Sequence, residues 1–242
     1  MQNISTYTVP AHDDTQTIEV GVNLAFDTTL DAEMLPTLLW LFIPYDGTKH
    51  EKLIQLQQIL CEELYRQIRA EFVGFRIVDG WLELYFYAQS AKKFEPIVAS
   101  LLEQQYSYEI GSYKDVKQKF YFDALYPDMK QLLQIRNHEI MLQLQEAGDQ
   151  CECDREVEHY LFFPTQSNAQ RALNKALDLE FTCKQEYIND ANELRYTIVL
   201  TKSHNISDAV ISDITEDLCD IALEEHGSYE GWSTILVEKN SL

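Results

Sequence analysis

The pattern of hydrophobic and polar positions predicts an alternation of strands and helices along the chain. From Ile18 to Leu24 every second residue is apolar, which is typical of a half-buried strand. The run LLWLFI at 38–43 is apolar throughout and precedes a proline and an Asp-Gly turn, so it predicts a buried strand. A helix is predicted next, because residues 48–51 have capping-box spacing and apolar residues recur every three or four positions over 53–68.

The rest of the first half continues this alternation. Asp79-Gly80 lies between two stretches rich in apolar and aromatic residues and predicts a hairpin. Pro96 is tolerated only in the first turn of a helix, so the following helix either starts late or is kinked there. The predicted elements are strands at 15–26, 38–43, 72–78, 81–87 and 119–125, and helices at 48–68 and from Ser90 or Glu95 to 102.

The second half repeats the same order of elements after one added helix. Even the first strands of the two repeats are alike, since WLFIP at 40–44 matches YLFFP at 160–164. The order βαββαβ is typical of a ferredoxin-like sandwich. We therefore predict an α+β protein of two tandem ferredoxin-like sandwiches, residues 1–127 and 128–242, the second with an extra N-terminal helix. The predicted elements of the second half are helices at 128–147, 167–177 and 206–225 and strands at 157–163, 181–187, 194–200 and 232–237.

The charge of the chain narrows the classes of partner. Forty acidic residues against 19 basic ones give a net charge of −21. This balance argues against direct binding to nucleic acid, which needs a basic footprint, and against anionic membrane surfaces. It favours basic protein partners, or solubility through self-repulsion. Residues 1–127 hold 10 basic and 18 acidic residues, and residues 128–242 hold 9 and 22, so the net charges are −8 and −13.

The sequence predicts a soluble cytoplasmic protein. No apolar run approaches the roughly 18 residues that a membrane span needs. The first residues, MQNISTY, lack the basic and apolar regions of a signal peptide. The five cysteines are an odd count that suits reduced thiols in a reducing compartment.

No motif of catalysis or cofactor binding is present. Glycine-rich phosphate loops, G-x-S-x-G, H-E-x-x-H and paired C-x-x-C are all absent, so we predict no enzymatic activity and no cofactor. Cys151 and Cys153 with His159, and Cys183 further on, resemble zinc ligands in type, but C-x-C is not the usual spacing. Loop and core cysteines are therefore the favoured interpretation, and no metal site is predicted.

The helix predicted at 206–225 carries an acidic stripe beside its apolar one. Like charges three and four residues apart repel, and a helix tolerates this either for solubility or because a basic partner removes the repulsion. The stripe consists of Asp213, Glu216, Asp217, Asp220 and Glu224.

The segment after this helix holds two aromatic residues. Tyr229 and Trp232 are either core residues or exposed contact residues, and a tryptophan that opens a strand is more often in the core. Glu230 lies between them in the sequence.

Several segments resemble a known family. QLQEAGD at 143–149, VEHY at 157–160 and SYEGWST at 228–234 are similar to the RraB family, over about residues 130–238. The first half, with Trp40 in its strand and Asp-Gly-Trp at 79–81, resembles a bacterial domain family of unknown function that precedes RraB-like domains. The resemblance implies an acidic bacterial protein that binds ribonuclease E and inhibits RNA decay.

These observations lead to two hypotheses. In the first, a non-enzymatic regulator binds a basic region of a ribonuclease E-type RNA-processing enzyme and competes there with RNA. In the second, the chain is a small-molecule or metal-binding sensor that uses the cleft between its two domains. For the first hypothesis the expected contact residues are Asp213, Glu216, Asp217, Asp220, Glu224, Tyr229, Glu230 and Trp232.

Overall fold

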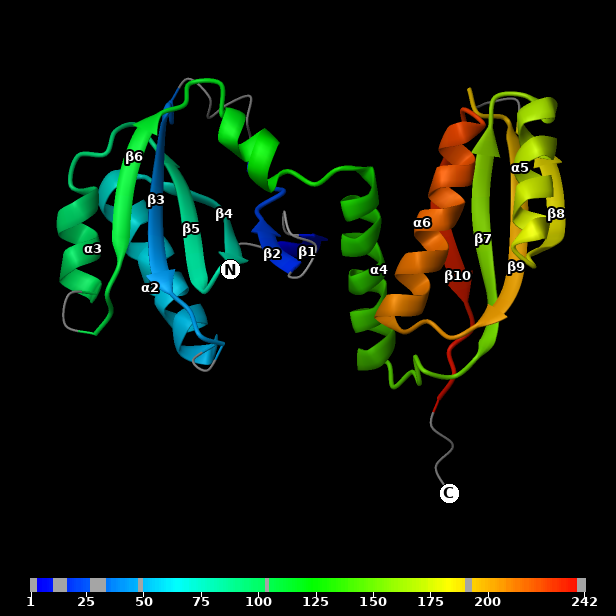
Figure 1. The fold of residues 1–242 in the computed structure, drawn as a ribbon, viewed down its shortest axis with the longest axis horizontal. Coiled ribbons are helices and arrows are strands. Elements are labelled where there is room, and N and C mark those ends of the chain that lie inside the picture. Colours follow the sequence, from blue (N-terminus) through cyan, green and yellow to red (C-terminus); the bar gives the residue numbers. More distant parts are fainter. Residues whose placement is uncertain are drawn as a thin grey trace. The chain divides into compact units, whose positions relative to one another are not determined.

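The computed structural model shows two compact units, residues 1–128 and 129–242, each with its own antiparallel sheet (Figure 1). The structure describes residues 4–10, 17–26, 34–47, 50–102, 105–189 and 193–238, with side chains for all of these except 50–53. The side chains of the helix cap predicted at 48–51 lie outside what is described. The predicted α+β class is confirmed.

The first unit is a six-stranded sheet in the order β1-β2-β4-β5-β3-β6. Two helices cover one face, where Leu39, Leu41 and Ile43 form the core with apolar side chains of both helices. The predicted helix with Pro96 begins at Phe94, which places the proline in the first turn. The strands are β1 (Ser5–Pro10), β2 (Thr17–Val22), β3 (Thr37–Pro44), β4 (Glu71–Val78), β5 (Trp81–Ala88) and β6 (Glu109–Lys114), and the helices are α2 (His50–Ile68) and α3 (Phe94–Leu102).

The strand predicted at 119–125 is wrong, because this segment is helical and includes a π-helical turn, η1 (Tyr121–Leu125). The buried carboxylate of Asp115 accepts hydrogen bonds from the backbone N–H groups of Lys119 and Phe120, both at 2.9 Å. This cap satisfies donors at the start of the helical segment, and it outweighs the strand preference of the aromatic residues. The last strand of the unit is β6, which the sequence did not predict.

The second unit is a four-stranded sheet in the order β10-β7-β9-β8, with all neighbouring strands antiparallel. Helices α5 and α6 pack against each other and on β7, and α4 packs on α6 (Figure 1). The Thr165 hydroxyl caps α5 by accepting from the Asn168 N–H. The elements are α4 (Met129–Glu146), β7 (Arg155–Phe163), α5 (Gln166–Asp178), β8 (Thr182–Ile188), β9 (Tyr196–His204), α6 (Asp208–Glu224) and β10 (Ser228–Thr234).

The core of the second unit lies between this sheet and its helices. Leu161 and Phe163 of β7 meet Ala172 of α5 and Leu218 of α6 there. The last strand begins four residues earlier than predicted, at Ser228, and this places the sequence YEGW within the sheet. Among the described residues, no helix is long and apolar enough to cross a lipid bilayer.

Candidate functional site

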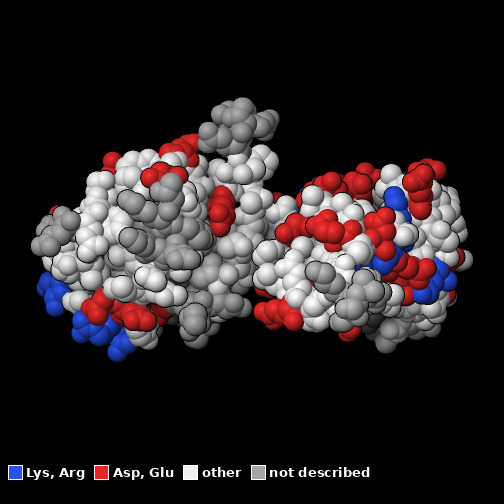
Figure 2. All heavy atoms as spheres, turned by 90° about the horizontal axis from the view of Figure 1, so that it is seen from below, with Lys and Arg blue, Asp and Glu red and all other residues white. Residues whose placement is uncertain are grey.

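The acidic stripe predicted on α6 reaches the surface of the second unit. Asp213, Asp217, Asp220 and Glu224 are exposed, and Glu216 is half-buried. Their spacing of three or four residues places them on one side of the helix, away from the buried residues Leu218 and Ala222. Figure 2 shows acidic side chains gathered in clusters on this unit, with Lys and Arg side chains near some of them.

Part of the stripe is already paired within the unit. On one side, Lys130 of α4 forms an ion pair with Asp220 at 2.8 Å, and the Gln134 amide donates to Glu216 at 3.2 Å. On the other side, Lys175 of α5 forms an ion pair with Glu224 at 2.8 Å. Asp213 and Asp217 have no ion pair among the described residues, so they are the most available charges of the stripe.

The two aromatic residues of the expected contact region are buried. Tyr229 is 8% exposed and Trp232 is 9% exposed. The Trp232 indole N–H donates to the Asn137 side-chain oxygen at 2.9 Å, and the Asn137 amide donates to the Thr215 hydroxyl at 2.8 Å. Of the three residues expected around position 230, Glu230 alone is exposed.

Tyr229 belongs to a buried chain of hydrogen bonds that the sequence did not predict, which we call the Tyr–His–His relay (Tyr229, His159, His204). The Tyr229 hydroxyl lies 2.9 Å from His159 Nδ1, and His159 Nε2 lies 3.2 Å from His204 Nε2. His204 Nδ1 lies 2.7 Å from the carbonyl oxygen of Asn205. His159 is completely buried.

The hydrogen bond from His204 to Asn205 determines which ring nitrogen carries the proton in each histidine. A carbonyl oxygen can only accept, so His204 Nδ1 carries a proton and donates to Asn205. In neutral His204 the Nε2 then accepts from His159 Nε2–H, and His159 Nδ1 accepts from the Tyr229 hydroxyl. Every ring nitrogen therefore has a partner when both histidines are neutral.

The electrostatics of the relay agree with this assignment. Burial, with smaller contributions from the charges of His204 and Lys202, lowers the pKa of His159 to about 3. Burial likewise lowers the pKa of His204 and raises the pKa of Tyr229 above its usual value. All three groups are neutral near pH 7, which suits a structural network better than proton transfer.

A second buried network closes the loop between α4 and β7. Arg155 donates to both oxygens of Asp149, at 2.8 and 2.7 Å, and the two side chains are 2% and 0% exposed. Arg155 also donates to backbone carbonyls of Gln150, Cys153 and Ile235. Burial by itself would raise the pKa of Asp149, but hydrogen bonds from Arg155 and the Val237 N–H outweigh it and lower the pKa. The network ties β7 to the segment after β10.

The residues considered as metal ligands lie apart in different surroundings. The Cys151 side chain packs in an apolar cluster with Val157 and Ile206, whereas Cys153 Sγ lies 3.7 Å from the side-chain oxygen of Gln150. The ring nitrogens of His159 are engaged in the relay. Within the described ranges, no three His, Cys, Asp or Glu side chains form a group that could hold a metal ion.

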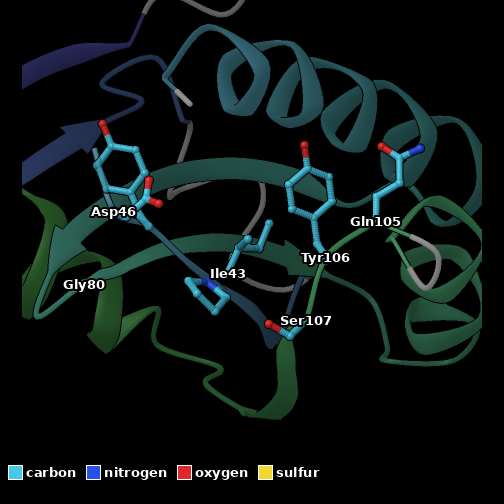
Figure 3. Close-up of a pocket in the computed structure, with 8 residues that line it drawn as sticks. Ile43, Asp46, Gly80, Gln105, Tyr106 and Ser107 are labelled. Carbon is cyan, nitrogen blue, oxygen red and sulfur yellow. The ribbon is translucent and has the colours of Figure 1, made fainter. Parts of the chain in front are cut away.

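The first unit has an open pocket of about 330 Å³ at one end of its sheet (Figure 3). Its wall combines the end of β3 with the loop before β6, and it includes Asp46, Tyr106 and Ser107. The pocket brings together a carboxylate, hydroxyl groups and an aromatic ring, but it contains none of the residues that the sequence singled out as a site.

Comparison with known protein families finds a match for each unit. Residues 134–234 match the family model of RraB, regulator of ribonuclease activity B, and residues 19–126 match that of DUF695, a family of unknown function. None of the curated proteins compared with the chain matches it.

Two solved structures are similar over most of the chain, both at 8% identity. The match to an unknown protein from Galdieria sulphuraria covers 99% of that protein and 83% of this chain, with a TM-score of 0.24. The match to a protein from Bacteroides thetaiotaomicron covers 93% of that protein and 82% of this chain, with a TM-score of 0.21. The family matches confirm the resemblance seen in the sequence: the second unit matches the RraB family model and follows a unit that matches the DUF695 model.

Proposed function

We propose that this chain is a non-enzymatic regulator that binds a basic region of a ribonuclease E-type RNA-processing enzyme and lowers its activity. The observation that carries the proposal is the match of residues 134–234 to the family of regulators of ribonuclease activity. The charge of the second half supports it, since residues 128–242 contain 22 acidic residues and 9 basic ones. An acidic surface speeds association with a basic segment and can displace RNA from it.

The exposed acidic residues of α6 are the proposed contact surface. Asp213 and Asp217 are available without breaking any ion pair, and Glu230 adds a further exposed carboxylate on β10. Glu216, Asp220 and Glu224 contribute once the partner competes with Gln134, Lys130 and Lys175, respectively. Tyr229 and Trp232 support the surface from inside and do not contact the partner.

We also propose that both units are ferredoxin-like sandwiches. In the second unit the strand order β10-β7-β9-β8 and the element order βαββαβ are those of this fold. In the first unit β3, β4, β5 and β6 with α2 and α3 repeat the same arrangement, and the β1–β2 hairpin extends the sheet beside β4. The fold by itself assigns no function.

The proposal is tested with the full chain, a ribonuclease E-type enzyme and a fluorogenic RNA substrate. We expect the chain to slow cleavage at low salt and to lose most of this effect at 0.5 M salt, because exposed charges are screened. Reversing Asp213 and Asp217 to Lys should weaken inhibition at least fivefold.

A matched control carries the same change of charge on the other unit. Glu62→Lys with Glu95→Lys alters two exposed acidic residues of α2 and α3 and should leave inhibition within twofold of the unchanged chain. Equal inhibition by both double variants would show that the α6 surface is not the contact. Failure of the unchanged chain to bind or inhibit the enzyme at low salt would disprove the proposed function.

A further inference from the structure

The sheet of the second unit has a second face that none of its described helices covers. Along β7, His159 and Leu161 point to the helices, so the alternate residues point to the opposite side. The register of the sheet places Thr197 of β9 opposite Phe162, and Tyr187 of β8 opposite Thr197. We call this side the open sheet face; its defining residues are Glu156, Glu158, Tyr160, Phe162, Tyr187 and Thr197.

The open sheet face combines aromatic rings with carboxylates. Tyr160 and Phe162 are half-buried, and Tyr187 is 40% exposed. The side chains of Glu156 and Glu158 are 65% and 28% exposed. The Tyr160 hydroxyl donates to Glu158 at 2.9 Å, so this ring lies beside a carboxylate. Such a pair suits a guanidinium group, which stacks on aromatic faces and pairs with a carboxylate through two parallel hydrogen bonds.

Lys184 at present occupies this acidic position. Its ammonium group lies 3.4 Å from Glu156 and 2.5 Å from Glu158, and its side chain is 46% exposed. The ion pair with Glu158 lowers the pKa of that carboxyl group, which keeps it ionised. A cationic ligand would therefore compete with Lys184 for these two carboxylates.

A buried hydroxyl on the same face has no partner. Thr197 is 2% exposed, and within the described part of the chain its hydroxyl oxygen makes no hydrogen bond. Unpaired buried polar groups are uncommon and cost free energy. On the open sheet face this hydroxyl lies between Phe162 and Tyr187, and a bound segment reaches it only when these neighbouring side chains shift.

We propose that the open sheet face is a docking surface for an arginine-rich segment of the partner. This inference rests on the proposed function and adds a second surface to the α6 stripe. Arginine is favoured over lysine because its planar guanidinium both stacks and forms paired hydrogen bonds, whereas an ammonium group acts as a point charge. The stripe steers the partner by charge, and the open sheet face selects arginine.

Two lysine variants with the same change of charge test the assignment. Lys184→Met frees two carboxylates on the open sheet face, whereas Lys130→Met frees Asp220 of the α6 stripe. The two lysines are similarly exposed, at 46% and 42% of their side chains. The full-length variants are titrated with fluorescein-labelled (Arg-Gly)6 and (Lys-Gly)6 peptides, and binding is followed by fluorescence anisotropy.

We expect Lys184→Met to tighten binding of the arginine peptide at least threefold, and Lys130→Met to change it less than twofold. Tyr187→Ala should weaken binding of the arginine peptide at least fivefold. It should weaken binding of the lysine peptide less than twofold, because only the stacking contact is lost. Thermal melts of each variant check that the fold is kept.

The opposite pattern would overturn the inference. If Lys130→Met tightens binding as much as Lys184→Met, or if Tyr187→Ala has no effect, the stripe is the contact and the proposed function stands without the open sheet face. If the unchanged chain binds neither peptide, the inference also fails. The cleavage assay with the ribonuclease then decides the proposed function separately.

Discussion

His159 shows how one buried residue can make the second unit sensitive to acid. The folded unit holds this imidazole neutral with a pKa of about 3, whereas the unfolded chain has the ordinary value of 6.5. Between these values the unfolded state binds more protons, so stability is fully present above pH 6.5 and is lost as the pH falls toward 3. Between pH 7 and pH 5 the loss from His159 is about 2 kcal/mol.

This pH dependence can be measured by urea unfolding at pH 7, 6 and 5. Replacing Trp40 and Trp81 by Phe leaves Trp232 as a fluorescent probe of the second unit. Above pH 5 the glutamates, with an ordinary pKa of 4.5, contribute little. His159→Gln should remove the share of His159, about 2 kcal/mol between pH 7 and pH 5, and leave the share of His204. An unchanged slope in this variant would contradict the assigned neutral relay.

The buried pair of Asp149 and Arg155 gives a second prediction. Removing one member of a buried pair leaves an uncompensated charge, so Asp149→Asn or Arg155→Met should each lower the free energy of unfolding by about 3–5 kcal/mol. The double variant should cost less than the sum of the two, which a double-mutant cycle in urea measures. Lys119→Met, which breaks the exposed pair with Asp123, should change stability by less than about 1 kcal/mol. If the losses of the two single variants add up to that of the double variant, Asp149 and Arg155 are not energetically coupled.

Helix α4 is the element that distinguishes the second unit from a plain βαββαβ sandwich. It lies antiparallel to α6 along a row of polar contacts, from Lys130–Asp220 to Asn137–Thr215. Asn137 joins α4 to both α6 and β10, because its amide donates to Thr215 and its oxygen accepts from Trp232. The helix therefore fixes the position of the proposed surface on α6.

Asn137→Leu tests this role. The change leaves the Trp232 N–H without its partner inside the protein and adds an apolar side chain, so we expect a loss of about 2–4 kcal/mol in the free energy of unfolding. The fluorescence emission of Trp232 should shift as its indole loses the hydrogen bond. Glu139→Leu, at an exposed position of the same helix, is the control and should have little effect. Equal stability of the two variants would rule out the bridging role.

The sequence predicted those elements in which apolar residues form a continuous run or recur at regular spacing. Strand β3 and helix α6 lie close to their predicted bounds because apolar runs and a helical stripe mark them. The edge strand β6 has no buried residue and no such run, so it was missed. The aromatic residues at 119–125 favoured a strand, but Asp115 caps a helical segment there through contacts that a periodic pattern does not contain.

The candidate site was predictable to a similar degree. The positions of the acidic residues on one side of α6 follow from helical spacing, whereas their pairing with Lys130 and Lys175 depends on tertiary packing. His204 lies 45 residues from His159 in the sequence, so no local pattern indicates the relay. The open sheet face likewise depends on the register of three strands.

At the scale of the whole molecule, the chain consists of two units with separate cores and unequal charge. Leu39 and Phe86 belong to the core of the first unit, and Leu161 and Leu218 to that of the second. The contacts divide the chain between Asp128 and Met129, one residue after the boundary expected from the sequence. Because each core is complete within its own unit, we expect the two units to fold independently.

Two fragments, 1–127 and 128–242, test this expectation. Each should give a cooperative thermal transition, and the sum of their circular dichroism spectra should equal that of the full chain. The second fragment, with a net charge of −13, should keep most of the affinity for a basic ribonuclease segment, whereas the first, at −8 and without α6, should bind at least tenfold more weakly. A second fragment that folds but does not bind would assign part of the contact to the first unit. A fragment that does not fold would show that stability is shared between the units.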